Sequence, residues 1–142
     1  TLTGGEPLLQ KDADKLLEAF SSEKDIRVEI ETNGSIDLKP FLKFENVSFT
    51  MDYKLPESDM EKYMNTDNFK ILRKKDTLKF VASSVNDLKK AKEIIVNIIF
   101  SPVFGKIELT DIVDFLKDNK LNDVRMQLQM HKFIWDPEER GV

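Results

Sequence analysis

Cysteine is missing from this 142-residue sequence, and histidine and tryptophan occur once each. Without cysteine the chain forms no disulfide and offers no thiolate to a metal or cluster. The absence is compatible with a cytoplasmic location, which we expect. No apolar run approaches the roughly 20 residues of a transmembrane helix, so no membrane partner is predicted. The net charge of −4 argues against direct nucleic-acid binding, which needs a basic face.

Several widespread catalytic patterns are also absent. The sequence contains no G-x-x-x-x-G-K-[ST] phosphate loop and no G-x-G-x-x-G dinucleotide fingerprint. It has no G-x-S-x-G nucleophile elbow either. A lone histidine cannot form a metal site by itself, and we predict no metal ligand and no directly catalytic side chain in this chain.

The residues that are present predict one globular α/β domain spanning 1–142. Hydrophobic residues make up 40% and charged residues 34%, which is the composition of a folded chain. Strand patterns alternate with helical ones, and this alternation predicts a parallel sheet with helices outside it. The central strands are apolar enough that we expect them to be buried on both faces. The strands are expected at 1–3, 26–32, 47–53, 76–82, 97–103 and 124–130.

Helical patterns lie between these strands. Apolar spacing predicts a helix over 8–20 and a weaker one near 60–72. Ser83 or Ser84 is expected to cap a helix that reaches Ile95, and Thr110 to cap the last helix. The first residues have the pattern of a strand that is ending, so we expect an excised domain or a fragment.

Polar residues gather where the predicted strands end, the edge at which βα folds place function. Gly4 and Gly5 follow the first strand, and glycine allows a ligand to approach the backbone closely. Glu31 ends the second strand, and His131, which could donate a hydrogen bond or move a proton, follows the last. Each has an ordinary alternative as a tight turn or an exposed polar side chain. Asp52 and Lys54 end the third strand, and they could simply pair with each other.

The motifs together resemble a known family. T-L-T-G-G-E-P at the start matches the G-G-E-P motif of radical S-adenosylmethionine enzymes. With E-T-N-G, M-D-Y-K and Q-L-Q-M-H-K-F-I-W following in order, the whole chain is similar to the 7-carboxy-7-deazaguanine synthases. The resemblance implies a partial (β/α) barrel that lacks its first βα unit. It also implies a carbon–nitrogen lyase that converts 6-carboxy-5,6,7,8-tetrahydropterin to 7-carboxy-7-deazaguanine, a step of queuosine biosynthesis and tRNA modification.

The resemblance implies a role for each matching residue. The S-adenosylmethionine ligands would be Gly4, Gly5, Glu6, Glu31, Asp52 and Lys54. Asp52 stands where many members have serine in an S-P-K motif, so its ribose-binding role is the least secure. The pterin ligands would be Thr3, His131 and, through its terminal carboxylate, Val142.

The family's other requirements are a [4Fe–4S] cluster, Mg²⁺ and an electron donor such as flavodoxin or ferredoxin. The cluster cysteines belong upstream of the G-G-E-P strand, so we expect this chain to bind no cluster and to be inactive alone. The missing first strand would leave an open sheet edge, through which a homodimer is possible. Two alternatives stay open: another radical enzyme, such as a glycyl-radical activase, and a non-catalytic binding fragment.

Overall fold

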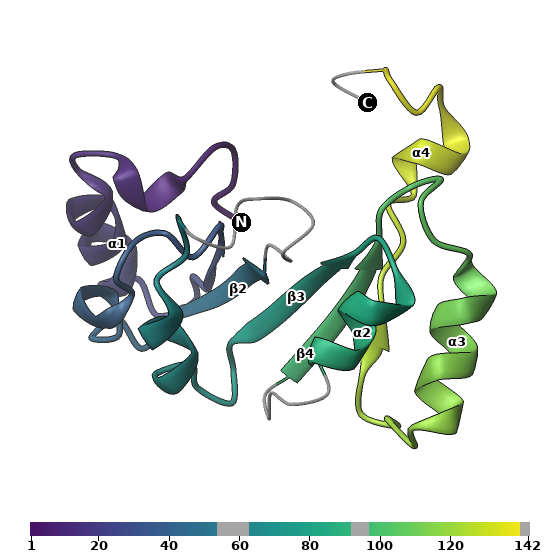
Figure 1. Cartoon of the computed structure of the whole chain (residues 1–142). Helices are drawn as coiled ribbons and strands as arrows, with labels where there is room; N and C mark the ends of the chain where they lie inside the picture. Colours follow the sequence, from purple (N-terminus) through teal and green to yellow (C-terminus); the bar gives the residue numbers. More distant parts are fainter. Residues whose placement is uncertain (54–62, 92–96, 140–142) are drawn as a thin grey trace.

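A computed structural model of the chain describes residues 1–53, 63–91 and 97–139 (Figure 1). In this part of the chain five strands form one parallel sheet in which the spatial order follows the chain order. The predicted α/β class and parallel sheet are therefore confirmed. The strands are β1 (Val28–Thr32), β2 (Val47–Tyr53), β3 (Thr77–Ala82), β4 (Asn97–Pro102) and β5 (Arg125–Met126).

The strands at the two edges of the sheet are shorter than the sequence predicts. The first expected strand is a single parallel bridge, in which Leu2 lies beside Ile30 of β1. The Leu2 N–H donates to the Glu29 carbonyl at 2.7 Å, and the Leu2 carbonyl accepts from the Glu31 N–H at 2.9 Å. At the other end, the strand expected over 124–130 is only the two residues of β5, and a helical turn begins at His131.

Helices and 3-10 turns connect the strands. Two sequence predictions about their starts had different outcomes. Ser84 does cap α2 (Val85–Ala91), because its Oγ accepts from the Asp87 N–H while the Asp87 carboxylate accepts from the Ser84 N–H. Thr110 does not cap α3 (Leu109–Asp118), because that helix begins at Leu109 and Thr110 already lies inside it. The elements are η1 (Pro7–Leu9), α1 (Ala13–Ser21), η2 (Lys39–Phe41), η5 (Thr66–Lys70), α2 (Val85–Ala91), α3 (Leu109–Asp118) and α4 (His131–Ile134).

The helix expected near 60–72 is replaced, where the structure describes it, by the 3-10 helix η5. Asn68 on η5 is buried, and its side-chain amide bonds the backbone at three points: Leu38 N–H, Gly34 carbonyl and Ile36 carbonyl. An asparagine that satisfies three backbone groups favours irregular structure over a regular helix.

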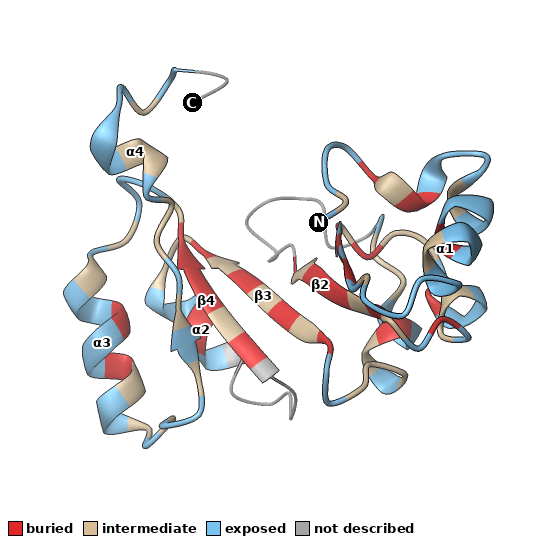
Figure 2. Cartoon of the chain, turned by 180° about the vertical axis from the view of Figure 1, so that it is seen from behind, coloured by how far each residue is buried: buried red, intermediate tan, exposed pale blue. Residues whose placement is uncertain are grey.

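One face of the sheet is apolar and covered, and the other is polar. The prediction that the central strands are buried on both faces is confirmed in part. Burial alternates between exposed and buried residues along the outer strand β1 and between half-buried and buried residues along β3 (Figure 2), whereas β2 has no exposed residue on either face. Ile30, Phe49, Phe80 and Phe100 are at most 1% exposed on the covered face. They form one core with side chains of the helices, Leu17, Leu88 and Ile112. Figure 1 shows α2 in front of β3 and β4, on this same face.

Candidate active site

The loop after the first strand segment lies at the carboxyl edge of the sheet. The bridge at Leu2 sets Thr3 at the end of the sheet, and the chain then turns through Gly4 and Gly5. Their φ angles are 94° and 60°, a region that disfavours other residues. A Cβ on either glycine would meet no atom within 4 Å. The backbone angles, and not crowding, therefore favour glycine here, and the space beside the loop is open.

Glu6 ties this loop to the end of β1. Its side chain is 7% exposed, and Oε2 accepts from the Asn33 N–H at 2.7 Å and from the Thr32 hydroxyl at 2.9 Å. Oε1 accepts from the Leu8 N–H at 3.2 Å, at the start of η1. Charged acceptors form the stronger hydrogen bonds in proteins. The carboxylate therefore fixes the two strand-end loops relative to each other.

The turn after β1 is shaped by its glycine. Gly34 has φ 74°, and a Cβ there would lie 2.9 Å from the Met51 sulfur. The Asn33 side chain accepts from the Ser35 N–H at 2.9 Å, which closes an Asx turn. Asn-Gly is an ordinary turn pair. A larger residue at its second position would require the Met51 and Met64 side chains to shift.

Thr3 and Glu31 lie beside each other where the N-terminal loop meets the end of β1, a place that we call the corner. The Thr3 hydroxyl donates to Glu31 Oε2 at 3.2 Å, and both side chains are exposed. Two residues that the sequence assigns to different ligands are thus neighbours, together with Gly4 and Gly5. Glu6 shares the loop, but its carboxylate is directed inward to Thr32 and Asn33.

The polar face of the sheet continues from this corner. Glu29 accepts from the Thr50 hydroxyl at 2.7 Å, and Lys79 lies 3.9 Å from Asp52, a long ion pair between β3 and β2. Asp52 therefore pairs across the strands, while its suggested partner Lys54 lies outside the described residues. A cavity of about 390 Å³ opens on this face. Its lining residues are Glu29, Glu31, Thr50, Lys79, Ile99, Arg125, Met126 and Gln127.

Sequence reasoning missed Glu29, Lys79, Arg125 and Gln127, although a signal was present. In 28–32 the charged residues alternate with apolar ones, a pattern that places Glu29 and Glu31 on one face. The Arg125 side chain forms no hydrogen bond or ion pair with any residue of the described ranges, although its backbone pairs with β4. Its guanidinium is therefore available to an anionic group in the cavity.

His131 is the first residue of α4, and this helix lies beyond the carboxyl ends of the strands. Figure 1 shows α4 and the N-terminal loop at opposite ends of this carboxyl edge of the sheet. His131 is half-buried. The chain therefore places His131 and Thr3 on the same edge but does not bring them into contact. Val142, the other expected substrate ligand, lies outside the described residues.

The residues present do not form a metal centre on their own. In the described ranges, no group of three or more histidine, aspartate and glutamate side chains is placed to hold a metal ion. No helix among the described residues is long and apolar enough to cross a membrane.

These features define an α/β protein with a polar site at the carboxyl edge of a parallel sheet, which is where enzymes of such folds bind their ligands. Comparison with curated proteins names its relatives. A 7-carboxy-7-deazaguanine synthase of Clostridium acetobutylicum is 60% identical over 151 residues, covering 100% of this chain and 68% of the relative. The chain belongs to the 7-carboxy-7-deazaguanine synthase family.

More distant members agree. The synthase of Leptospira interrogans is 35% identical, over 99% of this chain and 65% of the relative. That of Chlorobaculum tepidum is also 35% identical, over 99% of this chain and 67% of the relative. The chain spans about two thirds of the length of these relatives. No protein-family model matches the chain. No solved structure matches it either.

Proposed function

We propose that this chain forms the ligand-holding part of an enzyme that converts 6-carboxy-5,6,7,8-tetrahydropterin to 7-carboxy-7-deazaguanine with loss of ammonia. The relatives' shared name supports the product. The observation that carries the proposal is the corner held by Glu6. It presents Thr3, Gly4, Gly5 and Glu31 at the carboxyl edge of parallel strands. We propose further that the five-stranded sheet is part of a radical S-adenosylmethionine barrel.

The corner suits the amino-acid end of S-adenosylmethionine. Gly4 and Gly5 leave the backbone accessible, and Glu31 offers a carboxylate to an ammonium group. Asp52, on the polar face, would bind the ribose hydroxyls, with Lys54 beside it in sequence. Bound S-adenosylmethionine supplies the radical chemistry. The protein's own residues orient it and keep its charged groups paired.

Glu6 has a positioning role in this proposal. Both of its carboxylate oxygens already accept hydrogen bonds from Leu8, Thr32 and Asn33. A carboxylate that is satisfied in this way holds the loop in shape for the ligand. We therefore assign ligand contact to Gly4, Gly5 and Glu31 and assign loop geometry to Glu6.

The polar cavity suits the pterin. The substrate is a bicyclic molecule with a planar pyrimidine ring, a reduced second ring, ring N–H groups and one carboxylate, and the cavity offers both charge signs. Glu29 would accept from ring N–H groups and Arg125 would pair with the carboxylate, since guanidinium matches carboxylate geometry. Thr3 and His131 would bind the substrate from the two ends of the edge. An electron donor such as flavodoxin or ferredoxin completes the proposed reaction.

A [4Fe–4S] cluster does not fit these residues. The usual ligands are cysteine thiolates, and the sequence has no cysteine. Any cluster, and the Mg²⁺ that the resemblance implies, would be held by residues outside this sequence. No step of the proposal is assigned to a cluster on this chain.

A chimera tests the proposed function. The chain would replace the matching two thirds of the Clostridium acetobutylicum synthase, and formation of 7-carboxy-7-deazaguanine would be measured by mass spectrometry. We expect product from the chimera, and a loss of about 100-fold or more in kcat/KM for Glu31→Gln, because mispositioning by a lost contact has effects of this size. Glu45→Gln, an exposed glutamate remote from the cavity, is the matched control. A folded chimera that makes no product would contradict the proposal.

A further inference from the structure

The polar cavity has negative charge at one end and positive charge at the other. Glu29 and Glu31 of β1 line the acidic end. Lys79 of β3 and Arg125 of β5 line the basic end. The strands between β1 and β5 keep the two charge signs apart, because the spatial order of the strands follows the chain order. A ligand with N–H donors on one side and an anionic group on the other therefore fits the cavity in one orientation.

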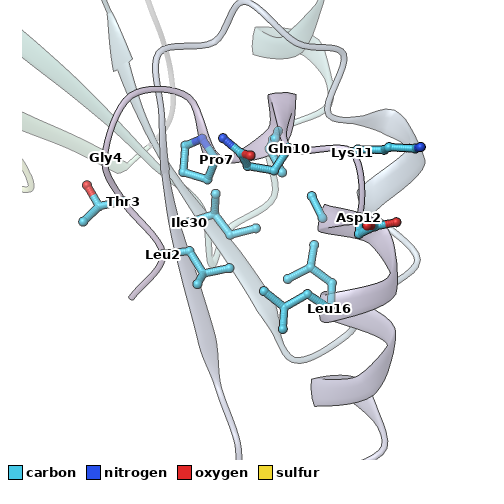
Figure 3. Close-up of a pocket in the computed structure, with 12 residues that line it drawn as sticks. Leu2, Thr3, Gly4, Pro7, Gln10, Lys11, Asp12, Leu16 and Ile30 are labelled. Carbon is cyan, nitrogen blue, oxygen red and sulfur yellow. The ribbon is translucent and has the colours of Figure 1, made fainter.

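The acidic end of the cavity is continuous with the corner. The Thr3 hydroxyl donates to Glu31, which also lines the cavity. Figure 3 shows the Thr3 side chain pointing away from the apolar side chains of Leu2 and Ile30. The acidic end therefore lies beside the residues proposed to hold S-adenosylmethionine, and the basic end lies farther along the sheet.

One row of residues across the sheet carries both cations. The register pairs Asp52 with Lys79, Lys79 with Ile99, and Ile99 with Arg125. The backbones of Lys79 and Arg125 are thus two strands apart, a separation of about 10 Å. Their long side chains line the cavity on either side of the half-buried Ile99. One anionic group above Ile99 is within reach of both cations.

The Lys79 ammonium is largely enclosed and lacks hydrogen-bond acceptors. Its side chain is 19% exposed, and it faces Asp52 Oδ1 at 3.9 Å, which is too long for a hydrogen bond. Within 1–53, 63–91 and 97–139, no other group forms a hydrogen bond or ion pair with its Nζ. An ammonium has three donors, and an enclosed charge is costly unless it is paired. These unsatisfied donors indicate that a ligand in the cavity supplies the acceptors.

We propose that Lys79 determines the specificity of this site for an anionic substrate. Its ammonium and the Arg125 guanidinium bind the substrate carboxylate above Ile99, and Asp52 keeps the lysine beside that position. The ring N–H groups then lie toward Glu29. The class of substrate rests on the proposed function. A neutral pterin leaves both cations without acceptors, and a site built in this way rejects an analogue that lacks the expected group.

Two pterins that differ by one carboxylate test this assignment. Pterin-6-carboxylate and pterin are stable and fluorescent, and each would be titrated into this chain, to which every lining residue of the cavity belongs. We expect pterin-6-carboxylate to bind about tenfold more tightly or better, because charge-assisted hydrogen bonds are the strong ones. Lys79→Met should weaken its binding by about tenfold or more and leave the binding of pterin unchanged. Lys79→Arg should retain most of the affinity.

Lys117→Met is the matched control. Lys117 also forms a long ion pair with an aspartate, Asp114 at 3.8 Å, but it lies on α3 outside the cavity. Its removal should change the binding of neither pterin, and circular dichroism checks that all variants fold. Three results would overturn the assignment: equal effects of the two methionine variants, an equal loss of both pterins in Lys79→Met, or no binding of either pterin to the unaltered chain.

A double variant separates direct contact from charge neutralisation. In Lys79→Met the Asp52 carboxylate would itself repel an anion, so the loss could arise without any contact from the lysine. Asp52→Asn with Lys79→Met removes both charges. If Lys79 binds the carboxylate, the double variant should stay about tenfold weaker than Asp52→Asn alone. Recovery to the affinity of Asp52→Asn would overturn the contact.

These titrations measure binding without turnover. Selective binding that depends on Lys79, together with a folded chimera that makes no product, would contradict the proposed function and leave the anionic specificity in place. A productive chimera whose chain binds both pterins equally would remove Lys79 from the site and leave the proposed function standing.

Discussion

The two faces of the sheet differ in chemistry, although neighbouring residues of the same strands build both. Phe80 is fully buried on one face, within 5.0 Å of the Tyr53 ring and 5.9 Å of the Phe100 ring between centroids. Its neighbour Lys79 lies on the other face, beside Asp52 and the polar cavity. The apolar face supplies the stability of the fold, and the polar face is the one that we propose binds ligands. Substitutions on the two faces should therefore affect different measurements.

The largest effect is expected on the apolar face. Phe80→Ala should reduce the free energy of unfolding by about 3–5 kcal/mol, because it removes a buried ring and leaves a cavity. Urea denaturation followed by circular dichroism measures the loss. The neighbouring Lys79→Ala is the control and should change it by less than about 1 kcal/mol, since its long ion pair is weak. Equal losses for the two variants would show that the faces are not divided in this way.

Two glutamates of one corner provide the next comparison. Glu6→Ala should cost about 1–3 kcal/mol, because the N–H groups of Leu8 and Asn33 lose their acceptor near the core. Glu31→Ala should change stability by about 0.5 kcal/mol or less, since Glu31 is exposed and accepts one bond, from Thr3. Thermal and urea unfolding of the two variants measure both values. A larger loss for Glu31 would reverse the assignment of positioning and ligand roles.

Arg125 tests the polar face for function without a change in stability. Arg125→Ala should leave the unfolding free energy within about 0.5 kcal/mol, because the side chain is exposed and unpaired among the described residues. In the chimera it should raise KM about tenfold or more through the lost charge-assisted bond to the substrate carboxylate. Arg27→Ala, another exposed arginine outside the cavity, is the control. An unchanged KM would remove Arg125 from the proposed substrate site.

The smallest effect belongs to an ion pair on neither face. The hydrogen bond and charge of Lys70 lower the pKa of Asp67, and Asp67 in turn raises the pKa of Lys70. A lowered carboxyl pKa means that any stabilisation is present above the unfolded pKa and is lost as the pH falls through the folded one. Carboxyl NMR should place the Asp67 midpoint below its ordinary value, and Lys70→Ala should return it there. Both side chains are fully exposed, so stability should barely change with pH here.

The fold followed from local patterns wherever those patterns were strong. Alternating apolar residues in 26–32 and 76–82 predicted the strands observed as β1 and β3, and repeated strand–helix order predicted the parallel sheet. Ser84 was found from its residue type, because a serine cap depends on neighbours a few residues away. Predictions failed where contacts with residues far away in the sequence decide the local structure. β5 ends early, and Asn68 holds an irregular segment through bonds to residues about 30 positions away.

The sequence by itself determined the family, the alternation of strands and helices and the loops that carry Thr3, Gly4 and Glu31. Motif identity and period-2 alternation are local, and they need no knowledge of what packs where. Only the tertiary structure decided that Glu6 is directed inward to the end of β1 and that Arg125 shares a cavity with Glu29. It also decided which face of the strands the helices cover. The reason is physical: periodicity shows which side chains share a face, but contacts between strands far apart in the chain decide what that face meets.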